Sequence, residues 1–82
     1  MSLHLHVVKT KLSAEEAIER AIKFFGEQGL GLDIVEQEPC CVHFKGGGGH
    51  VSVRAVARHG TTLNLAACEW DDHARRFIHE ID

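Results

Sequence analysis

The chain has 82 residues, which is enough for one domain, and we expect residues 1–82 to form a single one. Hydrophobic residues make up 44% of it, which argues against disorder, and the net charge of −3 gives no general attraction for nucleic acid or anionic membranes. No apolar run approaches the roughly 20 residues that cross a bilayer, and the N-terminus lacks a signal-peptide pattern.

The first predicted element is a strand over residues 3–9, where Leu-His-Leu-His-Val alternates cleanly. We expect one side of this strand to be buried, namely Leu3, Leu5 and Val7. His4 and His6 then share the opposite face.

A helix is predicted next. Ser13 is a good N-cap residue, and Glu16 three positions later completes a capping box. The apolar residues that follow lie at helical spacing: Ala14, Ala17, Ile18, Ala21, Ile22 and Phe25. Gly29 or Gly31 is expected to end this helix.

Residues 33–38 predict a short strand whose only aliphatic residues are Ile34 and Val35. Pro39 closes it, because proline cannot donate a backbone hydrogen bond to a sheet. Few apolar residues and a terminal proline both suit a strand at the edge of a sheet.

Three further strands between Cys40 and Cys68 are predicted to form a meander. A four-residue loop, Gly46 to Gly49, places Lys45 opposite His50, and a three-residue loop, Arg58 to Gly60, places Ala57 opposite Thr61. These registers bring apolar residues together on one face: Val42, Phe44, Val51, Val53, Ala55, Ala57, Leu63, Leu65 and Ala67.

The last predicted element is a helix that starts near Glu69 and runs almost to the end of the chain. Its apolar residues fall on one face: Trp70, Ala74, Phe77, Ile78 and Ile81. Acidic residues come first and basic residues later, as the helix dipole prefers.

The order β-α-β-β-β-β-α predicts an α+β domain with a five-stranded antiparallel sheet, strand order 1-5-4-3-2, and both helices on one face. In this order of elements the chain resembles the TATA-box-binding-protein-like fold, a group that includes helix-grip folds of the Bet v 1 and polyketide-cyclase kind. The resemblance covers the whole chain as topology, and no family motif carries over to individual residues. A ferredoxin-like arrangement is the alternative, although the helix it needs between the fourth and fifth strands is missing.

If both helices cover one face of the sheet, the other face is open and is the predicted binding surface. The registers place its candidate residues in rows, with Cys41, Arg54 and Asn64 in one and His43, Ser52 and Ala66 in the next. A third row holds Lys45, His50 and Cys68. On the neighbouring first strand we expect His4, His6 and Val8.

Catalytic and metal chemistry find little support in the residue spacing. Zinc sites usually show C-x-x-C or H-x(3–5)-H pairs, and neither spacing forms a convincing set in this chain. We therefore expect neither a metal nor another cofactor. A strand follows the four glycines, where a phosphate loop would need a helix. No oxyanion donor or orienting carboxylate accompanies Cys41, His43 or Ser52. Cys40 and Cys41 are neighbours whose disulfide would be strained, so we expect reduced thiols in a cytoplasmic protein.

These observations favour a non-catalytic module that binds a partner or forms a homodimer through the open face, centred on Arg54. The alternative is a small-molecule carrier or enzyme of helix-grip type, with a pocket between sheet and helices, and enzyme status stays open. Metal binding at the histidine–cysteine face is a third hypothesis. Nucleic-acid binding is disfavoured because Arg54 and Lys45 come without exposed aromatic residues.

Overall fold

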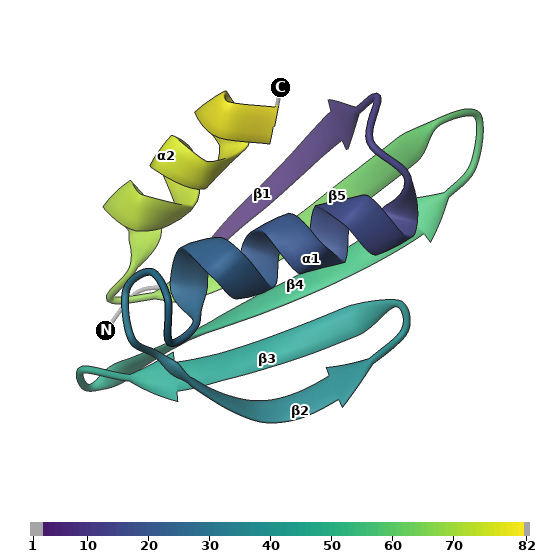
Figure 1. The fold of residues 1–82 in the computed structure, drawn as a ribbon. Helices are drawn as coiled ribbons and strands as arrows, with labels where there is room; N and C mark the ends of the chain where they lie inside the picture. Colours follow the sequence, from purple (N-terminus) through teal and green to yellow (C-terminus); the bar gives the residue numbers. More distant parts are fainter. Residues whose placement is uncertain (1–2, 82) are drawn as a thin grey trace.

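The computed structural model describes residues 3–81, and its elements follow the predicted order. They are β1 Leu3–Thr10, α1 Ala14–Phe25, β2 Asp33–Glu38, β3 Cys41–Gly46, β4 Gly49–Ala57, β5 Thr61–Cys68 and α2 Asp71–Ile81. The strands form one antiparallel sheet of order β1-β5-β4-β3-β2, and both helices lie on one face of it (Figure 1). The predicted α+β class and strand order are therefore confirmed.

The hydrophobic core lies between the helices and the sheet. Helix α1 packs over β3, β4 and β5, whereas α2 covers β5 and β1. Phe25 of α1 lies 5.5 Å from Phe44 of β3 and 5.4 Å from Phe77 of α2, measured between ring centroids, and all three are fully buried. Aromatic rings thus occupy the centre of the space between the sheet and the helices.

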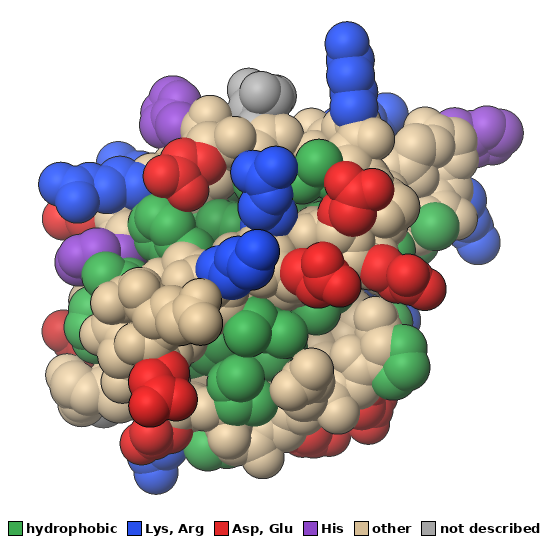
Figure 2. All heavy atoms as spheres, viewed as in Figure 1, with side chains coloured by type: hydrophobic (Ala, Val, Ile, Leu, Met, Phe, Trp, Pro, Cys, Tyr) green, Lys and Arg blue, Asp and Glu red, His purple; other side chains and the backbone are tan. Residues whose placement is uncertain are grey.

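The outer surface of the helices is highly charged. Figure 2 views the molecule from this side, and Lys, Arg, Asp and Glu side chains are interspersed there with small apolar patches between them. Within residues 3–81, neither α1, with 12 residues, nor α2, with 11, is long and apolar enough to cross a membrane.

The meander of β3, β4 and β5 has the predicted faces. Lys45 pairs with His50 and Ala57 with Thr61, as expected from the two loops. Val53 and Leu65 are each only 1% exposed on the helix side, and Arg54 is exposed on the other side. The alternation of apolar and polar residues therefore predicted both faces of this part of the sheet.

The tetraglycine turn is tighter than predicted. Gly46 and Gly49 also pair, so only Gly47 and Gly48 form the loop, with φ of 58° and 82° in the left-handed region that favours glycine. The Trp70 indole Nε1–H donates to the Gly46 carbonyl oxygen at 2.9 Å, and a Cβ on Gly47 would lie 2.7 Å from the indole ring. The glycines thus form a packed hairpin beneath Trp70.

The first strand has the opposite orientation from the predicted one. Leu3, Leu5 and Val7 are 56%, 72% and 70% exposed on the open face, so the prediction that they are buried is wrong. His6 and Val8 instead lie on the helix side, where Val8 pairs with the buried Leu63.

Contacts with α2 explain the orientation of β1. The Thr10 hydroxyl donates to the carbonyl oxygen of Ile81 at 2.8 Å, and His6 is hydrogen-bonded to Asp71 at the other end of the helix. Thr10 is buried opposite Thr61, which fixes the end of the strand. Because side chains alternate, burying Thr10, Val8 and His6 turns the three aliphatic residues outward.

The predicted N-cap of α1 is confirmed, since the Glu16 backbone N–H donates to Ser13 Oγ at 3.2 Å. The predicted end is wrong: α1 stops at Phe25, because the chain turns at Gly26 and the Leu32 N–H then donates to the Phe25 carbonyl. This turn buries Leu32 in the core.

Two further predictions concern the start of α2 and the position of β2. Helix α2 starts two residues later than the predicted Glu69, which adopts a left-handed φ of 70°. Strand β2 lies at the sheet edge with all of its residues exposed, as predicted for a strand with two aliphatic residues.

Candidate interaction site on the open sheet face

The three predicted rows of side chains are present on the open face. Cys41 pairs with Arg54, and Arg54 with Asn64, so these residues lie side by side across β3, β4 and β5. The next row holds His43, Ser52 and Ala66, and the third holds Lys45, His50 and Cys68. Of these residues Cys68 is buried, whereas Arg54 and Asn64 are exposed.

The open face also carries an apolar border that the sequence reasoning assigned to the core. We call Leu3, Leu5 and Val7 of β1 the aliphatic stripe. The register places Leu3 beside Cys68, Leu5 beside Ala66 and Val7 beside Asn64, so the stripe continues the three rows onto β1. Such a row of exposed aliphatic side chains is unusual for a surface that only meets water.

Two shallow hollows lie on this face. One of about 480 Å³ lies between the aliphatic stripe and the row of Cys41 and Arg54, and Ala66 and Ser52 also line it. The other, of about 650 Å³, is lined by His43, His50 and Cys68, and by Val35 from the β2 edge. Val35 projects there because a β-bulge interrupts the pairing of β2 with β3 between Ile34 and Glu36.

A polar pair lies between the two hollows. Nδ1 of His43 and Oγ of Ser52 are 2.7 Å apart and hydrogen-bonded. Glu36 pairs with His43 in the β2–β3 ladder, which brings a carboxylate to this row that the sequence reasoning had not identified. Among residues 3–81, His43 is hydrogen-bonded to Ser52 and not to Glu36.

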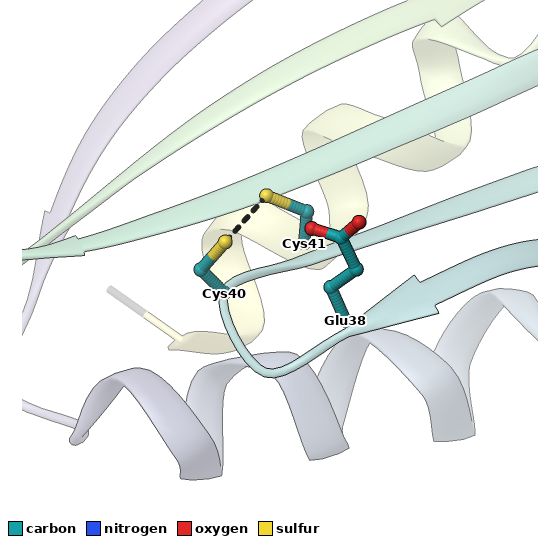
Figure 3. Close-up of side chains that lie close together, drawn as sticks. All are labelled: Glu38, Cys40 and Cys41. Atoms are coloured by element: carbon teal, nitrogen blue, oxygen red, sulfur yellow. Dashed lines mark hydrogen bonds between the residues drawn. The ribbon is translucent and has the colours of Figure 1, made fainter.

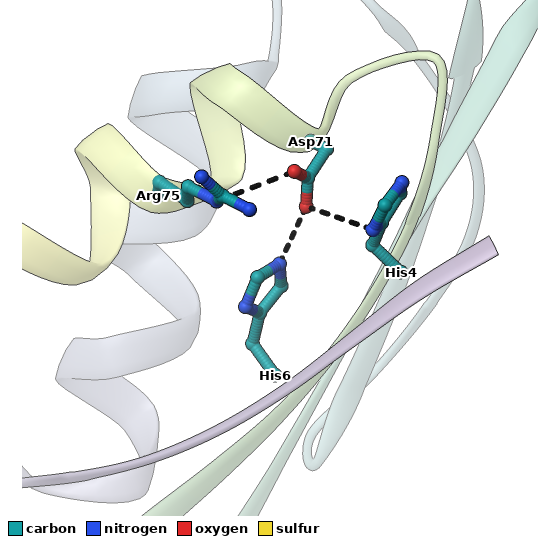
Figure 4. Close-up of polar contacts among 4 residues, drawn as sticks. All are labelled: His4, His6, Asp71 and Arg75. Atoms are coloured by element: carbon teal, nitrogen blue, oxygen red, sulfur yellow. Dashed lines mark hydrogen bonds and ion pairs between the residues drawn. The ribbon is translucent and has the colours of Figure 1, made fainter. Parts of the chain in front are cut away.

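His4 and His6 do not belong to the open face, so their predicted place there is wrong. Nε2 of His6 lies 2.6 Å from Oδ1 of Asp71, and Nδ1 of His4 lies 3.9 Å from the same oxygen (Figure 4). Arg75 approaches the other oxygen of Asp71 at 3.3 Å. The hydrogen bond with His6 lowers the pKa of Asp71, with Arg75 and His4 adding to the effect and desolvation opposing it.

The β2–β3 turn brings together a second group of functional side chains. Sγ of Cys40 and Sγ of Cys41 lie 2.9 Å apart, and the Glu38 carboxylate is close to both (Figure 3). The hydrogen bond with Cys40 raises the pKa of the Cys41 thiol to about 11, and partial burial adds to this while Arg54 opposes it. The sequence reasoning missed Glu38, although a turn at Pro39 and Cys40 could have indicated it.

Comparison with known proteins adds nothing to this geometry. Searches of family models, of curated proteins and of solved structures found no match to the chain.

Proposed function

We propose that the chain is a non-catalytic module that self-associates, with two copies packed open sheet face against open sheet face. The aliphatic stripe is the observation that carries this proposal, since Leu5 and Val7 are each at least 70% exposed and lie side by side with the rows of the meander. Twofold dimers are the commonest oligomers, and face-to-face packing is a common way to cover a sheet.

The size of the face suits a stable dimer. Five strands about 4.8 Å apart, with six to nine residues that rise about 3.3 Å each, span roughly 24 by 20–30 Å. That is roughly 600 Å² on each partner, at the lower end of the ~600–1,000 Å² that each side of a standard interface buries.

The face also carries both a projecting leucine and a hollow. Leu5 projects at the border of the 480 Å³ hollow, and the small side chains of Ala66 and Ser52 line that hollow. A leucine from a second copy can enter it without displacing a bulky residue. Full burial of one such side chain contributes about 1.5–3 kcal/mol, so the stripes of two copies offset much of the entropy lost on association.

A small ligand is the second candidate occupant of this face. The hydrogen-bonded pair of His43 and Ser52 lies at the 650 Å³ hollow and offers polar groups beside Val35. An enzyme or carrier of helix-grip type is less well supported because Phe25, Phe44 and Phe77 pack against one another at the centre of the space beneath the helices.

Molar mass by light scattering and sedimentation equilibrium tests the proposal. We expect the natural protein to be a dimer and Leu5→Lys to be a monomer with an unchanged circular-dichroism spectrum, because a lysine ammonium would be buried without a partner. Ile34→Lys is the matched control: it places the same charge on an exposed aliphatic residue of the other edge strand, on the helix side, and should remain dimeric.

Two outcomes count against self-association through this face. One is a natural protein that stays monomeric at high concentration. The other is a Leu5→Lys variant that is as dimeric as the natural chain.

A further inference from the structure

Three donor atoms of the kinds that bind metals converge at the β2–β3 turn. The two sulfur atoms and a carboxylate oxygen of Glu38 all lie within 4.8 Å of one another. In the single chain Glu38 and Cys40 are exposed and Cys41 is half-buried, so a cation can reach all three from solvent. None of these residues belongs to the aliphatic stripe or to the pair of His43 and Ser52, whereas Cys41 also lies in the row of Arg54 on the open face and lines the 480 Å³ hollow.

The hairpin explains why neighbouring cysteines point the same way. Within a strand, adjacent side chains point to opposite faces. Glu38 pairs with Cys41 across the ladder, so their side chains share a face, and Cys40 lies outside both strands in the turn. There its backbone turns its thiol toward that of Cys41 (Figure 3).

The turn is also tied to the rest of the sheet. The Ala55 backbone N–H of β4 donates to the carbonyl oxygen of Cys40 at 2.8 Å, which holds the turn against the adjacent strand. The donor atoms are therefore positioned by the fold before any cation arrives, and such preorganisation strengthens binding.

We propose that Glu38, Cys40 and Cys41 bind a thiophilic divalent cation, of which zinc is the common biological example, through two thiolates and one carboxylate oxygen. Thiolate and carboxylate are both ligands that zinc accepts, and two thiolates select soft cations over magnesium and calcium. Three protein ligands leave the fourth tetrahedral position to water or to a donor from a bound molecule.

The two sulfur atoms must move slightly apart to bind one zinc ion, and the charges of the ligands are then balanced. Two sulfurs on a tetrahedral zinc at about 2.3 Å lie about 3.8 Å apart, so the thiols must separate by roughly 0.9 Å. Rotation of the exposed Cys40 side chain provides that movement. Two thiolates and a carboxylate carry three negative charges, which the cation and the neighbouring Arg54 guanidinium offset, and both thiol protons leave to solvent.

Titration of the reduced, full-length protein with Cd²⁺ at a fixed, mildly alkaline pH tests the proposal. Cadmium–thiolate absorption in the ultraviolet should saturate at one ion per chain, and Zn²⁺ should displace the cadmium. We expect Cys40→Ser and Cys41→Ser each to weaken cadmium binding by about 100-fold or more. Glu38→Gln should weaken it by at least about tenfold, since even the loss of a residue that only supports a metal ligand has an effect of that size. Cys68→Ala, which removes the buried third thiol, should bind as the natural chain does.

Adjacent cysteines bind cadmium to some extent in any peptide, so the role of the fold needs its own measurement. We expect affinity to fall at least tenfold when the protein is unfolded in urea, because the carboxylate and the turn are then no longer held in place. Equal affinity in urea would overturn the proposal, as would full affinity in Glu38→Gln or one ion shared by two chains. Leu5→Lys, in which the open face stays uncovered, should bind the ion at least as tightly as the natural chain, so this test does not depend on self-association.

Discussion

Strand β1 and the meander of β3, β4 and β5 both alternate apolar and polar residues, yet only the meander has the faces that its pattern predicts. In the meander the apolar set points toward the helices, with Leu65 fully buried. In β1 the most regular apolar set, which includes Leu5, points away from them. A pattern of period two identifies a strand, but which face is buried depends on what covers each side.

The two regions differ in how their orientation is fixed. Tight turns join the strands of the meander, so each strand sets the register of the next and a slip would expose many valines and leucines at once. Strand β1 is followed by α1 and pairs with β5, which lies far along the chain, so no tight turn joins it to its partner. Its orientation is set instead by Thr10 and His6, which bond to opposite ends of α2.

A matched pair of leucine truncations should give the largest difference between the two regions. Leu65→Ala leaves a cavity in the core and should lower the free energy of unfolding by about 2–5 kcal/mol. Leu5→Ala should change it by less than about 0.5 kcal/mol at low protein concentration, where the monomer prevails, because its side chain is exposed. Urea denaturation measures both, and equal losses would mean that β1 is oriented as its alternation suggested.

The tetraglycine turn tests what holds the meander in register. Gly47→Ala should destabilise the protein by roughly 2 kcal/mol, since it combines a left-handed φ with a Cβ that meets the Trp70 ring. Gly48→Ala is the control: its φ is also positive but nothing lies within 4 Å of its Cβ, so the loss should be about 1 kcal/mol.

Trp70 is the single tryptophan, so its fluorescence in the folded state reports on this contact directly. We expect a red shift in Gly47→Ala, as the indole ring moves toward water, and none in Gly48→Ala. Identical spectra and stabilities in the two variants would contradict the packing of Trp70 on the turn.

The smallest effect concerns the contact of β1 with Asp71 and depends on pH. Because the pKa of Asp71 is lower in the folded protein than the ordinary value of 3.8, its carboxylate stabilises the fold fully above that value. The contribution is lost as pH falls through the lowered pKa. Asp71→Asn should therefore be less stable than the natural chain near neutral pH, and the difference should shrink in acid.

Asp72→Asn is the matched control for this experiment, since Asp72 carries the same charge in the same turn of α2 but is not bonded to His4 or His6. Urea denaturation at a series of pH values measures both variants. If the stability difference between Asp71→Asn and the natural chain did not vary with pH, the pKa of Asp71 would not be lowered in the folded protein.

Some positions on the open face were predicted from the sequence and others were not. The rows through Arg54 and His43 followed from loop lengths, because a hairpin of known length fixes which residues are opposite. The positions of the aliphatic stripe and of the Glu36 carboxylate could not be derived from loop lengths. The stripe lies on a strand that is separated from its partner along the chain, and Glu36 follows a β-bulge.

The sequence by itself determined the number and order of the elements, the meander with its registers, and the edge position of β2, because these depend on local periodicity and turn residues. Only the tertiary structure decided which side of β1 is buried, since Leu-His-Leu-His-Val fits either face until α2 offers Asp71 to His6. It also brought Glu38, Cys40 and Cys41 together, because a turn conformation overrides the alternation that would otherwise separate neighbouring thiols. Contacts between distant segments select between the two strand orientations that a short alternating pattern allows.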